Sequence, residues 1–132
     1  MNLDRIEKRN YTPHPTPLER AKRLEAHLGD NCPQIYIKRD DLLGLTGGGN
    51  KTRKLEYLVA DALAHNADTL VTCGAIQSNH CRLTLSAAIK EGLKCQLILE
   101  ERVPNTYQED ASGNNFLFRL MGVENITVVK KG

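Results

Sequence analysis

The chain has 132 residues, a length that suits one compact domain, and its 40% hydrophobic and 26% charged content is ordinary for a globular protein. A formal net charge of +2 and an aromatic content of 5% argue against a nucleic-acid partner. No apolar run is long enough to cross a bilayer, and residues 1–10 lack the apolar core of a signal peptide. We therefore expect a cytoplasmic protein without a membrane partner.

Apolar periodicity and turn residues predict the elements in chain order. Three prolines in residues 11–17 indicate an extended lead-in. Thr16, Pro17 and Glu19 then have the features of a helix start, with an N-cap, a proline at the first helical position and a capping glutamate. That helix is expected to end at residues 29–31. The remaining expected elements are a strand at 34–38, helices at 51–66, 79–91 and 114–121, and strands at 69–72, 94–99 and 126–129.

This alternation of strands and helices predicts an α/β fold in which crossover helices connect the strands of a parallel sheet. In such sheets ligands bind beyond the carboxyl ends of the strands. Two stretches with unusual chemistry, residues 47–54 and 72–82, each follow a predicted strand. Both are therefore candidates for a ligand site.

Lys51 lies where a glycine run, residues 47–49, ends and a helical pattern begins. It is a candidate Schiff-base nucleophile, because only a neutral amine attacks a carbonyl and repulsion from Arg53 and Lys54 favours that form. The glycines would also let a ligand approach the backbone closely. The competing interpretation is a solvated basic helix start after a flexible loop.

The second stretch, residues 72–82, runs from a short apolar strand through a glycine into a helix. Ser78 and Asn79 are both good N-cap residues for that helix. The free backbone N–H groups of such a start form an anion site, and the side chains of Gln77 and His80 add further donors around it. The competing interpretation is simply a well-capped helix.

Together the two stretches resemble the D-cysteine desulfhydrase / 1-aminocyclopropane-1-carboxylate deaminase family, which consists of pyridoxal-phosphate enzymes with a tryptophan-synthase-β-like fold. The resemblance runs from about Leu18 to the end of the chain. Residues 80–84 and 100–104 are more similar to the desulfhydrase than to the deaminase. The stretches that match in order and spacing are Lys38-Arg39-Asp40-Asp41, Gly48 to Glu56, Gln77 to Arg82 and Ala111 to Asn115.

The resemblance implies pyridoxal 5′-phosphate as cofactor, an amino acid as substrate, and β-elimination of D-cysteine to pyruvate, hydrogen sulfide and ammonia. Lys51 would hold the cofactor as a Schiff base and act as the base at the substrate Cα, with Ser78 as the second catalytic candidate. Asn50 and Asn79 would bind the cofactor, Asn79 at its 3′-oxygen. The residues implied to bind the substrate, chiefly its carboxylate, are Ser78, Asn79, His80 and, as a weaker candidate, Gln77.

Members of the resembled family are more than twice as long as this chain, and their phosphate-cradling glycine loop lies further along. The resemblance therefore assigns residues 1–50 to the N-terminal part of the large domain and 51–132 to most of the small α/β domain of an incomplete fold. The full-length protein would be a homodimer, and the 132-residue chain alone would be inactive. Two alternatives stay open: a 1-aminocyclopropane-1-carboxylate deaminase, and a non-catalytic fragment or remnant that binds the cofactor weakly or not at all.

Other kinds of site are disfavoured. A nucleotide-binding P-loop needs its lysine directly after a glycine, whereas Asn50 separates Gly49 from Lys51. No pair of the four cysteines has C-x-x-C spacing, which argues against a zinc site. Cys73, His80 and Cys81 could meet as metal ligands, but the fourth ligand has no evident source, so no metal is predicted.

Overall fold

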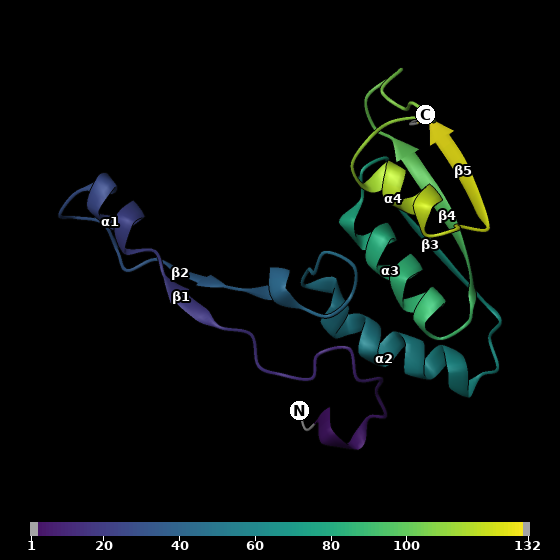
Figure 1. Ribbon diagram of the computed structural model, residues 1–132, viewed down its shortest axis with the longest axis horizontal. Helices are drawn as coiled ribbons and strands as arrows, with labels where there is room; N and C mark the ends of the chain where they lie inside the picture. The colour runs from purple at the N-terminus through teal and green to yellow at the C-terminus, as the bar shows by residue number, and fades with distance from the viewer. Residues whose placement is uncertain (1–2, 131–132) are drawn as a thin grey trace.

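The structure, a computed structural model, describes residues 3–130. Figure 1 shows a packed body made of helices and a sheet, from which a narrow arm extends to one side. In chain order the elements are the 3-10 helix η1 (Leu3–Arg5), β1 (Leu18–Arg20), α1 (Lys22–Leu28), β2 (Tyr36–Lys38), the 3-10 helix η2 (Asp40–Leu42), α2 (Lys51–Ala64), β3 (Thr69–Ala75), α3 (Asn79–Lys90), β4 (Lys94–Glu101), α4 (Asn114–Leu120) and β5 (Asn125–Lys130).

The arm differs from the sequence prediction. Strand β1 occupies the expected helix start, and the helix α1 begins only at Lys22. β1 pairs with β2 in an antiparallel two-stranded sheet, so the strand expected at 34–38 is not part of the parallel sheet. Two further backbone hydrogen bonds extend this pairing, from Ala21 to the Ile35 carbonyl at 2.8 Å and from Arg39 to the Pro17 carbonyl at 3.0 Å. This long-range pairing outweighs the local helix-start signal.

The body contains the predicted parallel sheet, with strand order β3-β4-β5. Helix α3 connects β3 to β4, and α4 connects β4 to β5 (Figure 1). The helices expected at 51–66, 79–91 and 114–121 are confirmed, with ends that shift by at most two residues. No helix within residues 3–130 has the length and apolar character needed to cross a membrane.

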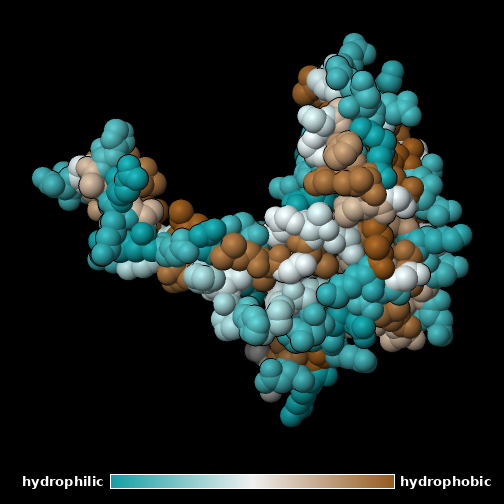
Figure 2. All heavy atoms as spheres, viewed as in Figure 1, coloured by the Kyte–Doolittle hydropathy of each residue, from teal (hydrophilic) through white to brown (hydrophobic). Residues whose placement is uncertain are grey.

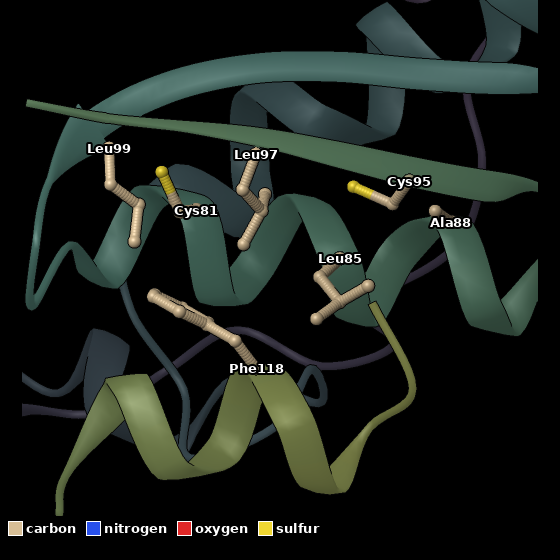
Figure 3. Packing of buried hydrophobic residues seen from close by; sticks show 7 residues of the cluster. All are labelled: Cys81, Leu85, Ala88, Cys95, Leu97, Leu99 and Phe118. Carbon is tan, nitrogen blue, oxygen red and sulfur yellow. The ribbon is translucent and has the colours of Figure 1, made fainter. Parts of the chain in front are cut away.

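The main core lies between β4, α3 and α4. Alternate residues of β4 point toward α3, and Figure 3 shows Phe118 of α4 pointing toward both of these elements. Phe118 and Leu99 are fully buried, and burial of such a side chain contributes about 1.5–3 kcal/mol. A second core joins α2 and α3 to the N-terminal segment. The buried members of the main core are Cys81, Leu85, Ala88, Cys95, Leu97, Leu99 and Phe118. Because α3 belongs to both cores, the position of its first residues is well defined.

The opposite face of the sheet is open in the described residues. Val71 of β3, Ile98 of β4 and Val129 of β5 are 61%, 36% and 39% exposed. Figure 2 shows apolar side chains gathered at the surface of both the body and the arm. Parallel sheets are usually covered on both faces, so this open face matters for the behaviour of the chain in solution.

Candidate cofactor and substrate site

The glycine loop before α2 has a conformation that requires glycine. Gly47, Gly48 and Gly49 have φ angles of 68°, 64° and 137°. A Cβ at Gly48 would overlap the Asp41 carbonyl, and one at Gly47 would overlap the guanidinium of Arg82. The space beside two of these glycines is therefore filled by the protein's own atoms, not kept free for a ligand as the sequence suggested.

Lys51 is the first residue of α2, directly after the N-cap residue Asn50. The Asn50 side chain does not cap the helix; its Oδ1 instead accepts a hydrogen bond from Lys51 Nζ at 3.2 Å. Among residues 3–130 this is the one hydrogen bond recorded for the Lys51 amine, which is half-buried. The amine is therefore held at the helix start and stays accessible to a ligand.

Arg53 does not act as the free cation that the sequence suggested. Its guanidinium makes a two-point contact with Asp40, at 2.7 Å to Oδ1 and 3.0 Å to Oδ2. This contact lowers the pKa of Asp40, and Thr16 Oγ1 supports it by donating to the same carboxylate at 2.9 Å. The charge of Arg53 is thus offset locally, which leaves Lys54 as the nearby cation of the predicted pair.

The sequence offered Ser78 and Asn79 as N-cap candidates for α3, and the N-cap is Ser78. Its Oγ accepts the backbone N–H of Cys81 at 3.2 Å, so the hydroxyl proton remains available to donate. The backbone N–H groups of Asn79 and His80 occupy the first two helical positions, where no intrahelical acceptor exists. A hydroxyl and two amides therefore converge at the positive end of the α3 dipole, an arrangement that suits a carboxylate.

The His80 imidazole lies between α3, β3 and α2. Its Nε2 is 2.9 Å from Thr72 Oγ1, and it lines a cavity of about 140 Å³ together with Lys54. Burial lowers the pKa of His80, and the charges of Lys54 and Lys51 lower it further. The neutral form of His80 is therefore favoured. Its ring contacts β3, whereas its backbone amide lies at the start of α3.

The Gln77 side chain joins the start of α3 to the loop before α4. Its Nε2 donates to the Ser112 carbonyl at 2.9 Å, and its Oε1 accepts the backbone N–H of Asn115 at 3.2 Å. Both ends of this amide are engaged, whereas Ser78 and Asn79 keep donors without a recorded partner in the part of the chain that the structure describes. Its role as a substrate contact stays a prediction.

Arg82 connects the two stretches, a role that the sequence did not reveal. It is 7% exposed, its Nη1 donates to the Thr46 carbonyl, and its Nη2 lies 3.2 Å from the Gly48 carbonyl and 3.3 Å from Asn79 Oδ1. One nitrogen therefore contacts both the loop that leads to Lys51 and the side chain of Asn79. Burial lowers the pKa of Arg82, and no carboxylate within residues 3–130 pairs with it. The sequence feature that could have pointed to Arg82 is that it is the single charged residue in the run 81–88.

The donors gathered here fit a carbonyl cofactor with an anionic oxygen and a carboxylate substrate. Lys51 supplies an accessible amine, Asn79 an unused Nδ2, and the α3 start a hydroxyl and two amides. In the described range, 3–130, no group of three or more His, Cys, Asp or Glu side chains could hold a metal ion. The fold is α/β, and Lys51 together with the start of α3 forms a candidate ligand site beside the carboxyl end of β3.

Comparison with known proteins agrees with this description. A family model described as "Pyridoxal-phosphate dependent enzyme" matches residues 10–132. The chain belongs to this family, whose cofactor is pyridoxal phosphate, and the resemblance seen in the sequence is confirmed. A solved structure described as an ACC deaminase homologue superposes with a TM-score of 0.85 at 38% identity, covering 98% of this chain and 37% of that one.

Curated relatives carry two different enzyme names. A 1-aminocyclopropane-1-carboxylate deaminase from Bradyrhizobium diazoefficiens is 48% identical over 92% of this chain, which spans 36% of that relative. A D-cysteine desulfhydrase from Yersinia enterocolitica is 54% identical over 83% of this chain and 32% of its own length. The chain therefore spans about a third of the length of the curated relatives it matches.

Proposed function

We propose that the whole protein catalyses the pyridoxal-phosphate-dependent β-elimination of D-cysteine to pyruvate, hydrogen sulfide and ammonia, and that this chain supplies its N-terminal part. The observation that supports it most is the contact of one Arg82 nitrogen with both the Gly48 carbonyl and Asn79, which brings the loop before Lys51 to the start of α3. The desulfhydrase is favoured over the deaminase because residues 80–84 and 100–104 resemble it, and its named relative has the higher identity of the two.

The proposal gives each residue a defined task. The bound cofactor would supply an electron sink that stabilises negative charge at the substrate Cα. The Lys51 amine takes the proton from Cα, so that the Cα–Cβ double bond forms while thiolate leaves from Cβ; one water then converts the released enamine to pyruvate and ammonia. Ser78 and the amides of Asn79 and His80 hold the carboxylate, and Asn79 Nδ2 donates to the cofactor's 3′-oxygen.

The same arrangement would distinguish the two enantiomers of the substrate, and the choice of the D-amino acid rests on the family resemblance. With the carboxylate fixed at the start of α3 and the substrate nitrogen directed toward Lys51, one face of Cα is turned toward the amine. Only one enantiomer then presents its Cα–H bond to Lys51. We also propose that residues 1–50 belong to the large domain and 51–132 to the small one, and, on the family resemblance, that the full-length protein is a homodimer.

Lys51 is tested by borohydride reduction of the gene product as the cell makes it, followed by peptide mass spectrometry. The expected result is a reduced cofactor adduct on the Lys51 peptide, absent in Lys51→Ala and also in Lys51→Arg, because a guanidinium does not lose the proton it must lose to attack a carbonyl. Lys22→Ala, at an exposed lysine of α1, is the control and should keep the adduct. An adduct on another lysine in wild type would contradict the assignment.

The substrate is decided by assays on one preparation. Sulfide and pyruvate from D-cysteine, with little from L-cysteine, would support the proposal. Formation of 2-oxobutyrate from 1-aminocyclopropane-1-carboxylate without sulfide would favour the second candidate, which the names of several relatives carry. Absence of both products from a preparation that contains the cofactor adduct would favour a non-catalytic protein.

A further inference from the structure

The side-chain amide of Asn79 has an orientation that its neighbours determine. Its Oδ1 lies 3.3 Å from Arg82 Nη2. A guanidinium has only donors, so the Asn79 atom that faces Arg82 must be the oxygen. The positions of oxygen and nitrogen in this amide therefore follow from the chemistry of its neighbours.

A second, independent contact gives the same orientation. Asn114 Nδ2 donates to the backbone carbonyl of Gln77 at 2.9 Å and to Asn79 Oδ1 at 2.8 Å. A backbone carbonyl only accepts, so the Asn114 atom that faces Gln77 must be the nitrogen, and its second proton then points to Asn79. The contacts form a chain that begins at the Gln77 carbonyl, which can only accept. It passes through the amides of Asn114 and Asn79 and ends at the Arg82 guanidinium, which can only donate.

The result is that Asn79 Nδ2 is the unused end of the amide. Asn79 is exposed, and within residues 3–130 its Nδ2 has no recorded hydrogen-bond partner. We propose that Arg82 and Asn114 are positioning residues that fix the Asn79 amide so that it offers an N–H donor, and not a carbonyl oxygen, to an anionic ligand oxygen. This inference rests on the proposed function, in which that oxygen is the cofactor's 3′-oxygen.

The fixed orientation has an energetic consequence. A freely rotating amide would offer its oxygen to the ligand for part of the time, and two facing oxygens repel where a donor would bind. Asn114 lies at the start of α4, 35 residues beyond Asn79, and Arg82 also contacts the Gly48 carbonyl. The loop before α4 and the loop before Lys51 are thus both coupled to the donor that faces the ligand.

The first test needs no substitution. In ¹⁵N-labelled protein without cofactor, NMR should show slow solvent exchange for the side-chain amide protons of Asn114, which are both engaged, and fast exchange for those of Asn79. Asn79→Ser and Asn114→Ser spectra assign the two signals. Protected Asn79 protons together with exposed Asn114 protons would overturn the proposal.

The second test uses the bound cofactor as a reporter. A donor to the 3′-oxygen favours the form in which that oxygen is ionised, so its loss should raise the pH midpoint of the cofactor's absorbance change. We expect Asn79→Ala to raise this midpoint by about one pH unit, the size of one hydrogen bond to a charged oxygen. Asn114→Asp, which replaces the donor to Asn79 Oδ1 by an acceptor, should raise it in the same direction. Asn31→Ala, an exposed asparagine in the arm, is the control and should leave it unchanged.

A double-mutant cycle separates positioning from a general loss of structure. If Asn114 acts through Asn79, Asn114→Asp should raise the midpoint less in the Asn79→Ala background than in wild type, because only the charge of the new carboxylate then remains to act. Full additivity, or an unchanged midpoint in Asn114→Asp alone, would overturn the positioning role while leaving Asn79 as a cofactor contact. An unchanged midpoint in Asn79→Ala would instead contradict the cofactor role given to Asn79 under the proposed function. Should Asn114→Asp fail to fold, Asn114→Ala and the exchange measurement on wild type give the same decision.

Discussion

The buried carboxylate of Glu56 accepts the backbone N–H of Tyr11 at 2.8 Å, across 45 residues of sequence. The same oxygen also accepts the N–H and the hydroxyl of Thr12, at 2.6 and 2.5 Å, while Lys8 lies 3.4 Å from the other oxygen. Glu56 lies on α2, so these contacts hold the N-terminal segment against the helix that begins with Lys51. Burial alone would raise the pKa of Glu56, but the hydrogen bonds from Thr12 and Tyr11 outweigh it, and the pKa is lowered.

Glu56→Gln should therefore destabilise the fold in a pH-dependent manner. Because the folded pKa is lowered, the contribution of Glu56 is present above the unfolded value of about 4.3 and is lost as pH falls through the folded value. We expect a loss of about 1–3 kcal/mol at pH 7 and a flatter pH dependence in the variant below about pH 5. Urea unfolding between pH 7 and pH 3 measures both. Glu7→Gln, at an exposed position, is the control. If the unfolding free energy depends on pH in the same way in both variants, the role given to Glu56 is wrong.

Gly74→Ala should disturb the start of α3. A Cβ at Gly74 would lie 2.7 Å from Ser78 Cβ and 2.9 Å from Cys81 Sγ, closer than carbon and sulfur atoms normally approach. Ser78 must then move and lose its contact with the Cys81 amide, so we expect a loss of about 1–3 kcal/mol in stability. Ser78→Ala alone should cost about 1 kcal/mol as a lost N-cap. The double variant should lose less than the sum, because removing the hydroxyl relieves part of the overlap; strict additivity in thermal unfolding would argue against this account.

The elements of the body could be predicted from the sequence because each depends on local pattern. Helix α2 follows its apolar period, and Ser78 is a capping residue whatever surrounds it. The arm could not be predicted from local pattern, because β1 exists only through its pairing with β2, where Leu18 lies opposite Lys38. Arg82 was missed for the same reason: its partners Thr46 and Gly48 lie 36 and 34 residues away, and no local pattern reports contacts at that range.

The four cysteines should fall into two reactivity classes. Cys73 is exposed and Cys32 is half-buried, whereas Cys81 and Cys95 are 0% and 2% exposed. Burial raises the pKa of Cys95 to about 12 and also raises that of Cys81, so very little thiolate is available to react in the folded state. A chromogenic disulfide reagent should therefore label two thiols quickly and two only as the chain unfolds. In the double variant Cys32→Ser/Cys73→Ser only the slow phase of labelling should remain. Fast labelling of all four thiols in wild type would show instead that the core opens readily.

The last prediction concerns the 132-residue chain expressed alone. In the proposed function Lys51 and the α3 start contact the carbonyl and anionic oxygens of the cofactor. The family resemblance implies that the phosphate-cradling glycine loop lies in the part of the relatives that this chain does not match. Each missing charge-assisted hydrogen bond removes roughly 1.5–3 kcal/mol, and about 1.4 kcal/mol corresponds to a tenfold change in affinity. Two or three such losses should weaken cofactor binding by orders of magnitude and leave no measurable turnover.

The open face of the sheet gives the same experiment a second result. Val71, Ile98 and Val129 are exposed where parallel sheets are normally covered, so the isolated chain should self-associate. Size-exclusion chromatography with absorbance detection of bound cofactor measures both properties at once. Ile98→Thr, which keeps the branching at Cβ but makes the side chain smaller and polar, should shift the profile toward monomer without changing cofactor affinity, because Ile98 lies on the face opposite α3. A monodisperse monomer that holds stoichiometric cofactor and releases sulfide from D-cysteine would show instead that these 132 residues are sufficient for the reaction.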